Sequence, residues 1–403
     1  MSSSSLIFRM MERTKLNRDS LVVTHRMLHI AKKTRVQCTK TIVSLGVGLA
    51  GLPVAMGCDW DGPFPNTRAY FETASLEDVS TCLEFESDAT SVDYWGYTPL
   101  HWAAGYSPDP EVVNALIGAG ADPNAVNHAG STPLHEAARN NENPDVVRAL
   151  VRAGNNLGTR NAFGRLPVHE AARSNTDVSV IQALIEMGSE VDASGYYSFT
   201  PLHEAARRNT NPSVTNYLLD AGADLLARDE LPYHGATALD WATMLNENPR
   251  VIEVLLEFGA DPLTGSAYQS DTPLHWAALR DDLPELLRIL LAAGGDPNVR
   301  NGPGDTPLHW AAAYSENEVI VALLLDAGAD PMARNLIDNT PLHLAANYTT
   351  NRLIIEILLG AGADPLAEGH RGRTPVESAR SNPNTEVRYM LQTAAAQGAG
   401  QVE

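Results

Sequence analysis

Seven histidines share one position in a repeated phrase, and their spacing is the first feature of this chain that could support chemistry. They are His101, His135, His169, His203, His275, His309 and His343. Histidine serves proteins as a general base and as the commonest metal ligand. Three of the seven are followed directly by a glutamate, which is how a zinc-protease helix motif begins. These glutamates are Glu136, Glu170 and Glu204, and none is followed by the second histidine that such a motif requires.

The histidines lie inside a seven-residue phrase that reads Thr-Pro-Leu-His-Trp-Ala-Ala at its first copy, residues 98–104. Its nine copies begin at Thr98, Thr132, Leu166, Thr200, Thr237, Thr272, Thr306, Thr340 and Thr374. The intervals are 34, 34, 34, 37, 35, 34, 34 and 34 residues. A nearly fixed period in this range predicts stacked helical units, none of which can bury its apolar face alone.

Each copy also has residue types that begin and end helices. Threonine is a favoured N-cap, and proline is tolerated at the first helical position because its missing donor would be unpaired there anyway. Two alanines leave a helix face thin enough for close packing. An apolar run that ends in glycine follows, and glycine can take the left-handed conformation that stops a helix. These glycines are Gly120, Gly154, Gly188, Gly222, Gly259, Gly294, Gly328 and Gly362. Each unit therefore reads as helix, short loop, longer helix and extended turn.

The phrase, together with the Gly-Ala-Asp-Pro-Asn that follows at residues 120–124, resembles the ankyrin repeat, in a bacterial type with a 34-residue period. The resemblance covers about residues 67–397 and implies an all-α solenoid in which the recurring histidine is structural. The family's usual period is 33, and its inter-helix loop usually holds Gly-His. Here that loop reads Asn143-Pro144 in one unit and is one residue longer. Asparagine can cap and proline can begin the second helix, so the turn is kept by other means.

Stacking excludes a metal array built from the histidines. Equivalent residues of adjacent units lie about one helix-packing distance apart, roughly 8 to 10 Å, whereas zinc holds each ligand at about 2 Å. The chain also shows no phosphate-binding glycine loop, nucleophile elbow or paired-carboxylate motif. We therefore predict no catalytic, cofactor or metal site. A hydrolase or metal protein hidden in the array is the less favoured alternative, and metal analysis of the purified chain would test it.

Charge is unevenly distributed along the chain. The formal net charge is −20, but residues 1–57 hold nine basic side chains against two acidic ones, which leaves 20 basic and 47 acidic residues in the remainder. Phosphate backbones would be repelled by such a surface, so nucleic acid is not an expected partner. The three cysteines, Cys38, Cys58 and Cys82, do not suggest a disulfide framework. We expect Cys82, which would have no partner in the mature chain, to be a packed apolar side chain.

Residues 1–57 read as a leader segment. Basic residues precede an uncharged, apolar run over residues 41–57, which is typical of a secretory signal peptide. The run is short for a membrane span and is interrupted by Pro53. Residues 55–58, Ala-Met-Gly-Cys, resemble the lipobox of bacterial lipoproteins, in which the cysteine is lipidated, although leucine is commoner where Ala55 stands. Ordinary cleavage after Gly57, or a buried capping helix, would also fit. Met27 is the expected true start.

These observations divide the chain. We expect a leader at 1–57, of which 1–26 is an over-extended reading frame, a linker at 58–66 and an N-terminal capping repeat at 67–97. Ankyrin repeats follow at 98–397, with the ninth copy as the C-terminal cap, and then a tail at 398–403. Export would place the mature chain at the cell envelope, on the periplasmic side of a membrane and anchored by lipid at Cys58. The alternative is a cytoplasmic chain.

Aromatic residues are frequent in the turns before each phrase, where the resemblance implies partner contact. They are Tyr94, Trp95, Tyr97, Phe163, Tyr196, Tyr197, Phe199, Tyr233 and Tyr268. Exposed aromatic residues on rigid turns are common binding hot spots. The alternative is that several of them pack on the next turn.

Arginines follow the alanine pairs of the central copies, at Arg139, Arg173, Arg207, Arg208 and Arg280, with Tyr106, Tyr314 and Tyr348 nearer the ends. Two interpretations are open. The arginines could pair with glutamates three residues earlier and offset the helix dipole. They could instead form a basic stripe that accepts a partner's carboxylates.

The period lengthens before Thr237, where three extra residues precede the phrase. This loop holds Leu231, Pro232, Tyr233 and His234, and we interpret it as a specificity loop because insertions in repeat arrays often map to the binding face. A tolerated lengthening is the alternative. The sequence thus predicts a monomeric, exported, membrane-tethered scaffold that binds a protein partner and is not an enzyme. A cytoplasmic or secreted bacterial effector that binds host proteins is the alternative.

Overall fold

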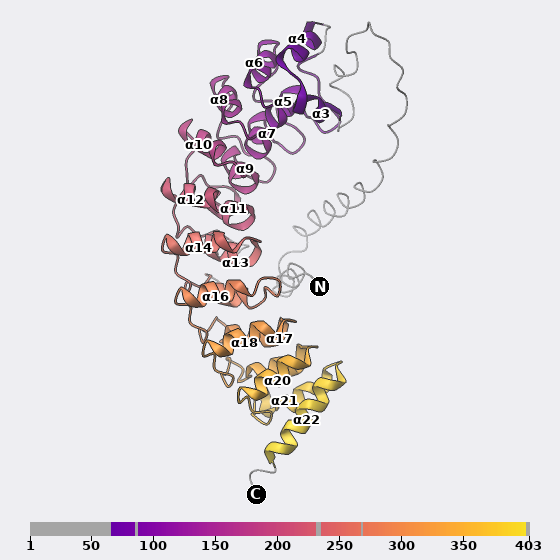
Figure 1. Ribbon diagram of the computed structural model, residues 1–403, viewed down its shortest axis with the longest axis vertical. Helices are drawn as coiled ribbons and strands as arrows, with labels where there is room; N and C mark the ends of the chain where they lie inside the picture. The colour runs from indigo at the N-terminus through magenta and orange to yellow at the C-terminus, as the bar shows by residue number, and fades with distance from the viewer. Residues whose placement is uncertain (1–65, 85–87, 231–234, 267–268, 400–403) are drawn as a thin grey trace, which may run out of the picture.

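The protein is described by a computed structural model over residues 66–84, 88–230, 235–266 and 269–399. Regular structure in these ranges is entirely helical, as the sequence predicts. The helices stack in chain order into a curved array, shown in Figure 1. The leader, the linker up to residue 65 and the insertion at residues 231–234 lie outside the described residues, so the predictions made for them stay predictions.

Nine helix pairs form the array, and each pair begins at one copy of the phrase. The first helices are α5 (Pro99–Tyr106), α7 (Pro133–Asn140), α9 (Pro167–Ser174), α11 (Pro201–Arg208), α13 (Ala238–Leu245), α15 (Pro273–Ala277), α17 (Pro307–Tyr314), α19 (Pro341–Tyr348) and α21 (Pro375–Ser378). The second helices are α6 (Pro110–Gly118), α8 (Pro144–Arg152), α10 (Val178–Glu186), α12 (Pro212–Asp220), α14 (Pro249–Glu257), α16 (Glu285–Ala292), α18 (Glu318–Asp326), α20 (Arg352–Gly360) and α22 (Thr385–Ala399). Second helices α6 to α14 line the convex edge of the arc in Figure 1.

A helix pair without the phrase precedes the first repeat. It consists of α3 (Asn66–Thr73) and α4 (Leu76–Glu84), which pack against α5 and α6. Cys82 in α4 is only 2% exposed, and its sulfur lies 3.3 Å from the Tyr70 hydroxyl. This cysteine is disulfide-bonded in the full chain, whereas the sequence suggests no disulfide framework. The other cysteines of the sequence, Cys38 and Cys58, lie outside the described residues.

The residues that were predicted to begin and end helices do so in the structure. Thr98 is an N-cap with extended backbone angles, and Pro99 is the first helical residue of α5. Asn143 caps α8, because its side-chain oxygen accepts the Asp145 main-chain N–H at 2.9 Å. Gly120 ends the first pair with a φ of 98°, in the left-handed region that glycine occupies without strain.

The core is a continuous column between the two helix layers. Leu100, Ala103 and Ala104 of α5 are fully buried, and the same positions are buried in the seven copies that follow, though not all of them in the ninth. Small side chains here let successive first helices approach closely. A buried asparagine ties the inter-helix loops together: Asn141 donates through Nδ2 to the carbonyl oxygens of Ala104 and Ser107, both at 2.8 Å. Such bonds satisfy carbonyl groups that a helix end leaves unpaired.

The extended turns between repeats form short hairpin-like projections, which we call fingers. The fully described ones span residues 93–97, 127–131, 161–165, 195–199, 301–305, 335–339 and 369–373. Each is closed by a main-chain bond between its ends, for example from Asn161 N–H to the Arg165 carbonyl at 2.9 Å. In this finger the Asn161 side-chain oxygen also accepts the main-chain N–H groups of Phe163 and Arg165. The fingers are therefore rigid turns with a fixed tip.

Candidate partner-binding surface

The recurring histidines join consecutive repeats through both ring nitrogens. In the second repeat, the Thr132 main-chain N–H donates to His135 Nδ1 at 3.1 Å. Nδ1 is thus an acceptor, so the proton lies on Nε2, which donates to the Arg165 carbonyl oxygen at 3.0 Å. Burial lowers the pKa of His135 to about 4, which keeps the ring neutral. The structural role that the resemblance implies is confirmed, and neither nitrogen is left to bind an ion.

The fifth repeat has no such bond, because Asp240 stands in place of the histidine. Its Oδ2 accepts the main-chain N–H and the hydroxyl of Thr237, both at 2.9 Å. Its Oδ1 is buried without a hydrogen-bond partner. Burial raises the pKa of Asp240 to about 7. Asp240 makes no hydrogen bond to the described residues of the following finger, so the polar bond that the histidine makes in other repeats is absent from that part of the chain.

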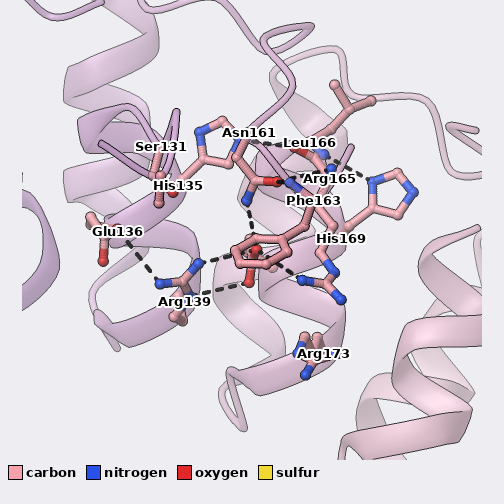
Figure 2. Close-up of polar contacts among 12 residues, drawn as sticks. Ser131, His135, Glu136, Arg139, Asn161, Phe163, Arg165, Leu166, His169 and Arg173 are labelled. Carbon is pink, nitrogen blue, oxygen red and sulfur yellow. Dashed lines mark hydrogen bonds and ion pairs between the residues drawn. The ribbon is translucent and has the colours of Figure 1, made fainter. Parts of the chain in front are cut away.

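Arginines and buried glutamates form a second ladder between repeats, and Figure 2 shows its beginning, where Arg139 meets Glu136. Arg139 of α7 lies 3.1 Å from Glu170 of α9, and Arg173 of α9 lies 2.9 Å from Glu204 of α11. Arg165, on the finger that directly precedes α9, contacts Glu204 of α11 at 2.6 Å. The close pairs therefore run from one repeat to the next. Of the predicted pairs within one helix, Glu136 with Arg139 is present at 3.6 Å.

The arginines of the ladder determine how its glutamates titrate. Glu204 is 3% exposed, and although burial raises its pKa, Arg165 and Arg173 lower it to below the usual value. The next copy has Trp241 in place of glutamate, and the Arg207 guanidinium lies 4.8 Å from the centroid of its ring. Most of the predicted basic stripe thus holds the repeats together.

Arg280 does not belong to a basic stripe either. It is 3% exposed, and its guanidinium donates to the carbonyl oxygens of Thr243 and Asn246 at 2.9 and 3.0 Å. Asparagine bonds the equivalent carbonyls in several other loops, for example Asn246 with Ala206 and Asn209, so Arg280 takes the place of an asparagine beyond the short helix α15. Arg208 differs: it is exposed at the end of α11, and no carboxylate of the described residues lies within ion-pair distance of it.

Five of the predicted aromatic residues lie exposed at finger tips. The exposed fraction is 82% for Tyr94, 55% for Trp95, 54% for Phe163, 54% for Tyr196 and 50% for Tyr197. Equivalent tips follow one another along the array, since main-chain bonds link neighbouring fingers. The His128 N–H donates to the Trp95 carbonyl at 2.9 Å, and the Ala162 N–H donates to the Ala129 carbonyl at 2.8 Å.

Three predicted contact residues pack inward instead. Phe199 is 7% exposed and packs edge-on against Trp241 at 5.2 Å, so its predicted exposure is wrong. Tyr97 is half-buried and stacks on Trp102 at 4.6 Å. Tyr106 is half-buried, with the Arg68 guanidinium 4.2 Å above its ring. Tyr97 and Phe199 lie just before the N-cap, at the base of the finger, where the side chain points to the next repeat.

One exposed tip escaped the sequence prediction. Leu336 and Ile337 are 77% and 50% exposed on the finger 335–339. They occupy the positions that Tyr94 and Trp95 hold in the first finger, and the repeat register alone could have identified them. Of the other predicted residues, Cys58, Tyr233, His234 and Tyr268 lie outside the described residues. The exposed finger tips and the exposed side chains at the ends of the first helices together make the candidate partner-binding surface.

The described ranges contain neither a candidate metal site nor a candidate membrane span. No group of three or more histidine, cysteine, aspartate or glutamate side chains there could hold a metal ion. None of the helices there is both long and apolar enough to cross a bilayer.

Comparison with known proteins defines the class. The family of ankyrin repeats matches at residues 100–194, 134–229, 169–266 and 274–369, which together make up more than half of the chain. The protein belongs to the ankyrin repeat family. No curated protein matches it. Among solved structures, it is similar to the human ASB11 ankyrin repeat domain, at 24% identity and a TM-score of 0.50, over 58% of this chain and 100% of that chain. At that identity the likeness shows the fold alone.

Proposed function

We propose that this protein is a non-catalytic, monomeric scaffold that binds a protein partner through its finger tips and the adjoining ends of its first helices. Ankyrin repeats typically serve as interaction scaffolds, so a protein partner is implied by the family. The observation that supports this particular surface is the row of large apolar side chains exposed at equivalent tips, from Tyr94 to Ile337.

Rigidity makes these tips suitable for recognition. The ring of Tyr196 lies over Gly164, where an added Cβ would approach the ring to 2.1 Å, so one face of the tyrosine is fixed and the other meets solvent. Tyr94 and Trp95 contact each other edge to face at 5.0 Å. Side chains that are already ordered lose little entropy on binding, and buried aromatic anchors commonly dominate interface energies.

Binding is tested with the full chain. A partner captured by the wild-type protein is purified, and its dissociation constant is measured for a variant with Tyr94, Trp95, Tyr196 and Tyr197 changed to alanine. We expect a loss of affinity of at least about thirtyfold, since one hot-spot residue contributes about 2 kcal/mol or more. The control replaces Val319, Leu353 and Tyr389, which are exposed on second helices, and should bind normally. Equal affinity for both variants would refute the proposed surface.

We further propose that residues 1–57 export the chain, and that a lipid at Cys58 tethers it to the periplasmic side of a membrane. The basic and apolar pattern of the leader and the lipobox-like residues 55–58 support this proposal. A fusion of the first 58 residues to a reporter that is active only outside the cytoplasm tests export. Activity is the expected result, and a silent reporter with normal expression favours the cytoplasmic alternative.

The anchor and the disulfide bond at Cys82 compete for the same few cysteines. Cleavage before Cys58 would remove Cys38 with the leader, and a lipidated Cys58 has no thiol to form a disulfide. Within one mature chain, lipidation would therefore leave Cys82 as a free thiol, so the disulfide bond counts against the anchor. The intact mass and thiol content of the mature chain separate the two forms: the anchor predicts added acyl mass with one free thiol.

A further inference from the structure

An open notch of about 310 Å³ lies between the third and fourth repeats, where α9 and α11 end. It is lined by Arg173, Ser174, Thr176, Arg208, Asn209 and Thr210. No apolar side chain lines it. Two guanidinium groups and three exposed hydroxyl groups face this space, which makes it a site rich in hydrogen-bond donors.

Arg208 is the unusual member of this set. The equivalent position at the end of the first helix holds Tyr106, Asn140, Ser174, Leu245, the buried Arg280, Tyr314, Tyr348 and the buried Asn382 in the other repeats. Arg208 is the exposed cation at that position among the described residues, and its guanidinium has no carboxylate within ion-pair distance there. Although its side chain is exposed, the protein around the guanidinium partly desolvates it, and this desolvation together with the like charge of Arg173 lowers the pKa of Arg208. The repeat scaffold thus holds two cations near each other, while the nearest acidic groups that act on Arg208, Glu204 and Glu247, lie beyond ion-pair distance of it.

The ladder beside the notch adds a third guanidinium group. Arg165 and Arg173 both contact the Glu204 carboxylate, and the charges of both also act on Arg208. Three guanidinium groups therefore lie around Glu204 in a chain whose net charge is −20. Such an island favours an anionic group that enters the notch, while the acidic surroundings repel long polyanions such as nucleic acid.

We infer that the notch between Arg173 and Arg208 accepts a carboxylate side chain from an acidic segment of the protein partner. The inference rests on the proposed function and specifies the chemistry of the partner at one place on the inner surface. Arginine presents its N–H groups in a planar fork that matches a carboxylate, and a bond between the two ions is stronger than a neutral one. The hydroxyl groups of Thr176 and Thr210 can donate to the same oxygens.

A purely structural role for Arg208 makes a different prediction. As the last residue of α11, its charge offsets the helix dipole. Arg152 is an exposed arginine at the last position of α8 and has the same dipole role on the second-helix layer. Arg152→Gln is therefore the matched control for Arg208→Gln. Equal, small losses of stability in both variants are expected, whereas binding should depend on Arg208 alone.

The test uses the full chain and a fluorescein-labelled octaglutamate peptide, measured by fluorescence polarisation at about 0.15 M salt, where distant charges are screened. We expect Arg208→Gln to weaken binding about tenfold or more, because a hydrogen-bonded charge contributes on the order of 1.5 to 3 kcal/mol. Arg152→Gln should leave the affinity unchanged. Unlabelled octaglutamate should displace the probe, and octaglutamine and inorganic phosphate at equal concentration should not.

Two results would overturn the inference. In one, both arginine variants bind octaglutamate as the wild type does. In the other, phosphate displaces the probe while octaglutamate does not, which would assign the notch to phosphate groups. Neither result affects the proposed function, which fails instead if the variant at Tyr94, Trp95, Tyr196 and Tyr197 captures the partner with wild-type affinity.

Discussion

His135 and Arg165 lie thirty residues apart in the chain and are joined by a 3.0 Å hydrogen bond from the imidazole Nε2 to the main-chain carbonyl. The bond connects the first helix of one repeat to the finger that introduces the next. The same connection recurs at six other histidines, for example from His101 to Ser131 at 2.9 Å. The most chemically suggestive residues of the sequence are thus the ones that hold consecutive repeats together.

His135→Ala should destabilise the array without affecting the finger tips. The substitution removes the Nε2 bond to Arg165 and leaves the Thr132 N–H unpaired in a buried place. We expect a loss of about 2 to 4 kcal/mol in the free energy of unfolding, measured by urea denaturation. His128→Ala, at an exposed finger tip, is the control and should change stability by less than about 0.5 kcal/mol. Similar losses in the two variants would contradict the structural role.

Acid should unfold the protein through the same histidines. Burial lowers the pKa of His101, His135, His203 and His275 to about 4, below the ordinary value of 6.5. The unfolded chain therefore binds protons more readily between these two values, so stability is complete above pH 6.5 and is lost as the pH falls towards 4. Each histidine should contribute a slope of about 1.4 kcal/mol per pH unit in that window. Urea midpoints from pH 7 to pH 4.5 measure the slope, and a flat profile would contradict the prediction.

Asp240 should have the opposite dependence. Burial raises its folded pKa to about 7, so the unfolded state releases its proton first, and the cost of this aspartate grows as the pH rises from about 4 to about 7. Asp240→Asn removes the ionisable group at nearly constant shape. We expect the variant to gain stability relative to wild type as the pH rises, by a few kcal/mol in total, with no further gain above pH 7. A stability difference that is independent of pH would show that Asp240 is not held neutral.

Removing the carboxylate of Glu204 should cost more than removing a surface one. Glu204→Gln leaves Arg165 and Arg173 without their shared counter-charge at a 3% exposed position. We expect a loss of about 3 kcal/mol in the free energy of unfolding. Glu253→Gln breaks an exposed pair with Arg250 and should cost less than about 1 kcal/mol. A double-mutant cycle of Arg173→Gln with Glu204→Gln measures the coupling, and additive losses would refute the ladder.

The sequence predicts the repeats well because their signals are local. Threonine caps, the proline that follows and the terminal glycines lie within a few residues of the backbone groups they serve, so Thr98 and Gly120 could be assigned before the structure was known. The pairing of Arg139 with Glu170 could not be, because it depends on the displacement between stacked repeats. A search within one helix finds Glu136, which is the more distant partner.

Exposure at the fingers was predicted less well, since a turn does not reveal which side chains point back to the array. Phe199 and Tyr196 are three residues apart in one finger, yet the first is buried against Trp241 and the second is half exposed. Leu336 is not aromatic and so falls outside the aromatic pattern, although its place in the period matches that of Tyr94. Residue type and register must therefore be read together.

The central claim is that recurring residues stack the repeats and the variable tips recognise the partner. Hydrogen–deuterium exchange of the full chain, with and without the captured partner, tests it most directly. The account predicts new protection at the fingers 93–97, 161–165, 195–199 and 335–339, with little change in the second helices α8, α10 and α12. Protection confined to those second helices, with the fingers exchanging as in the free protein, would contradict it.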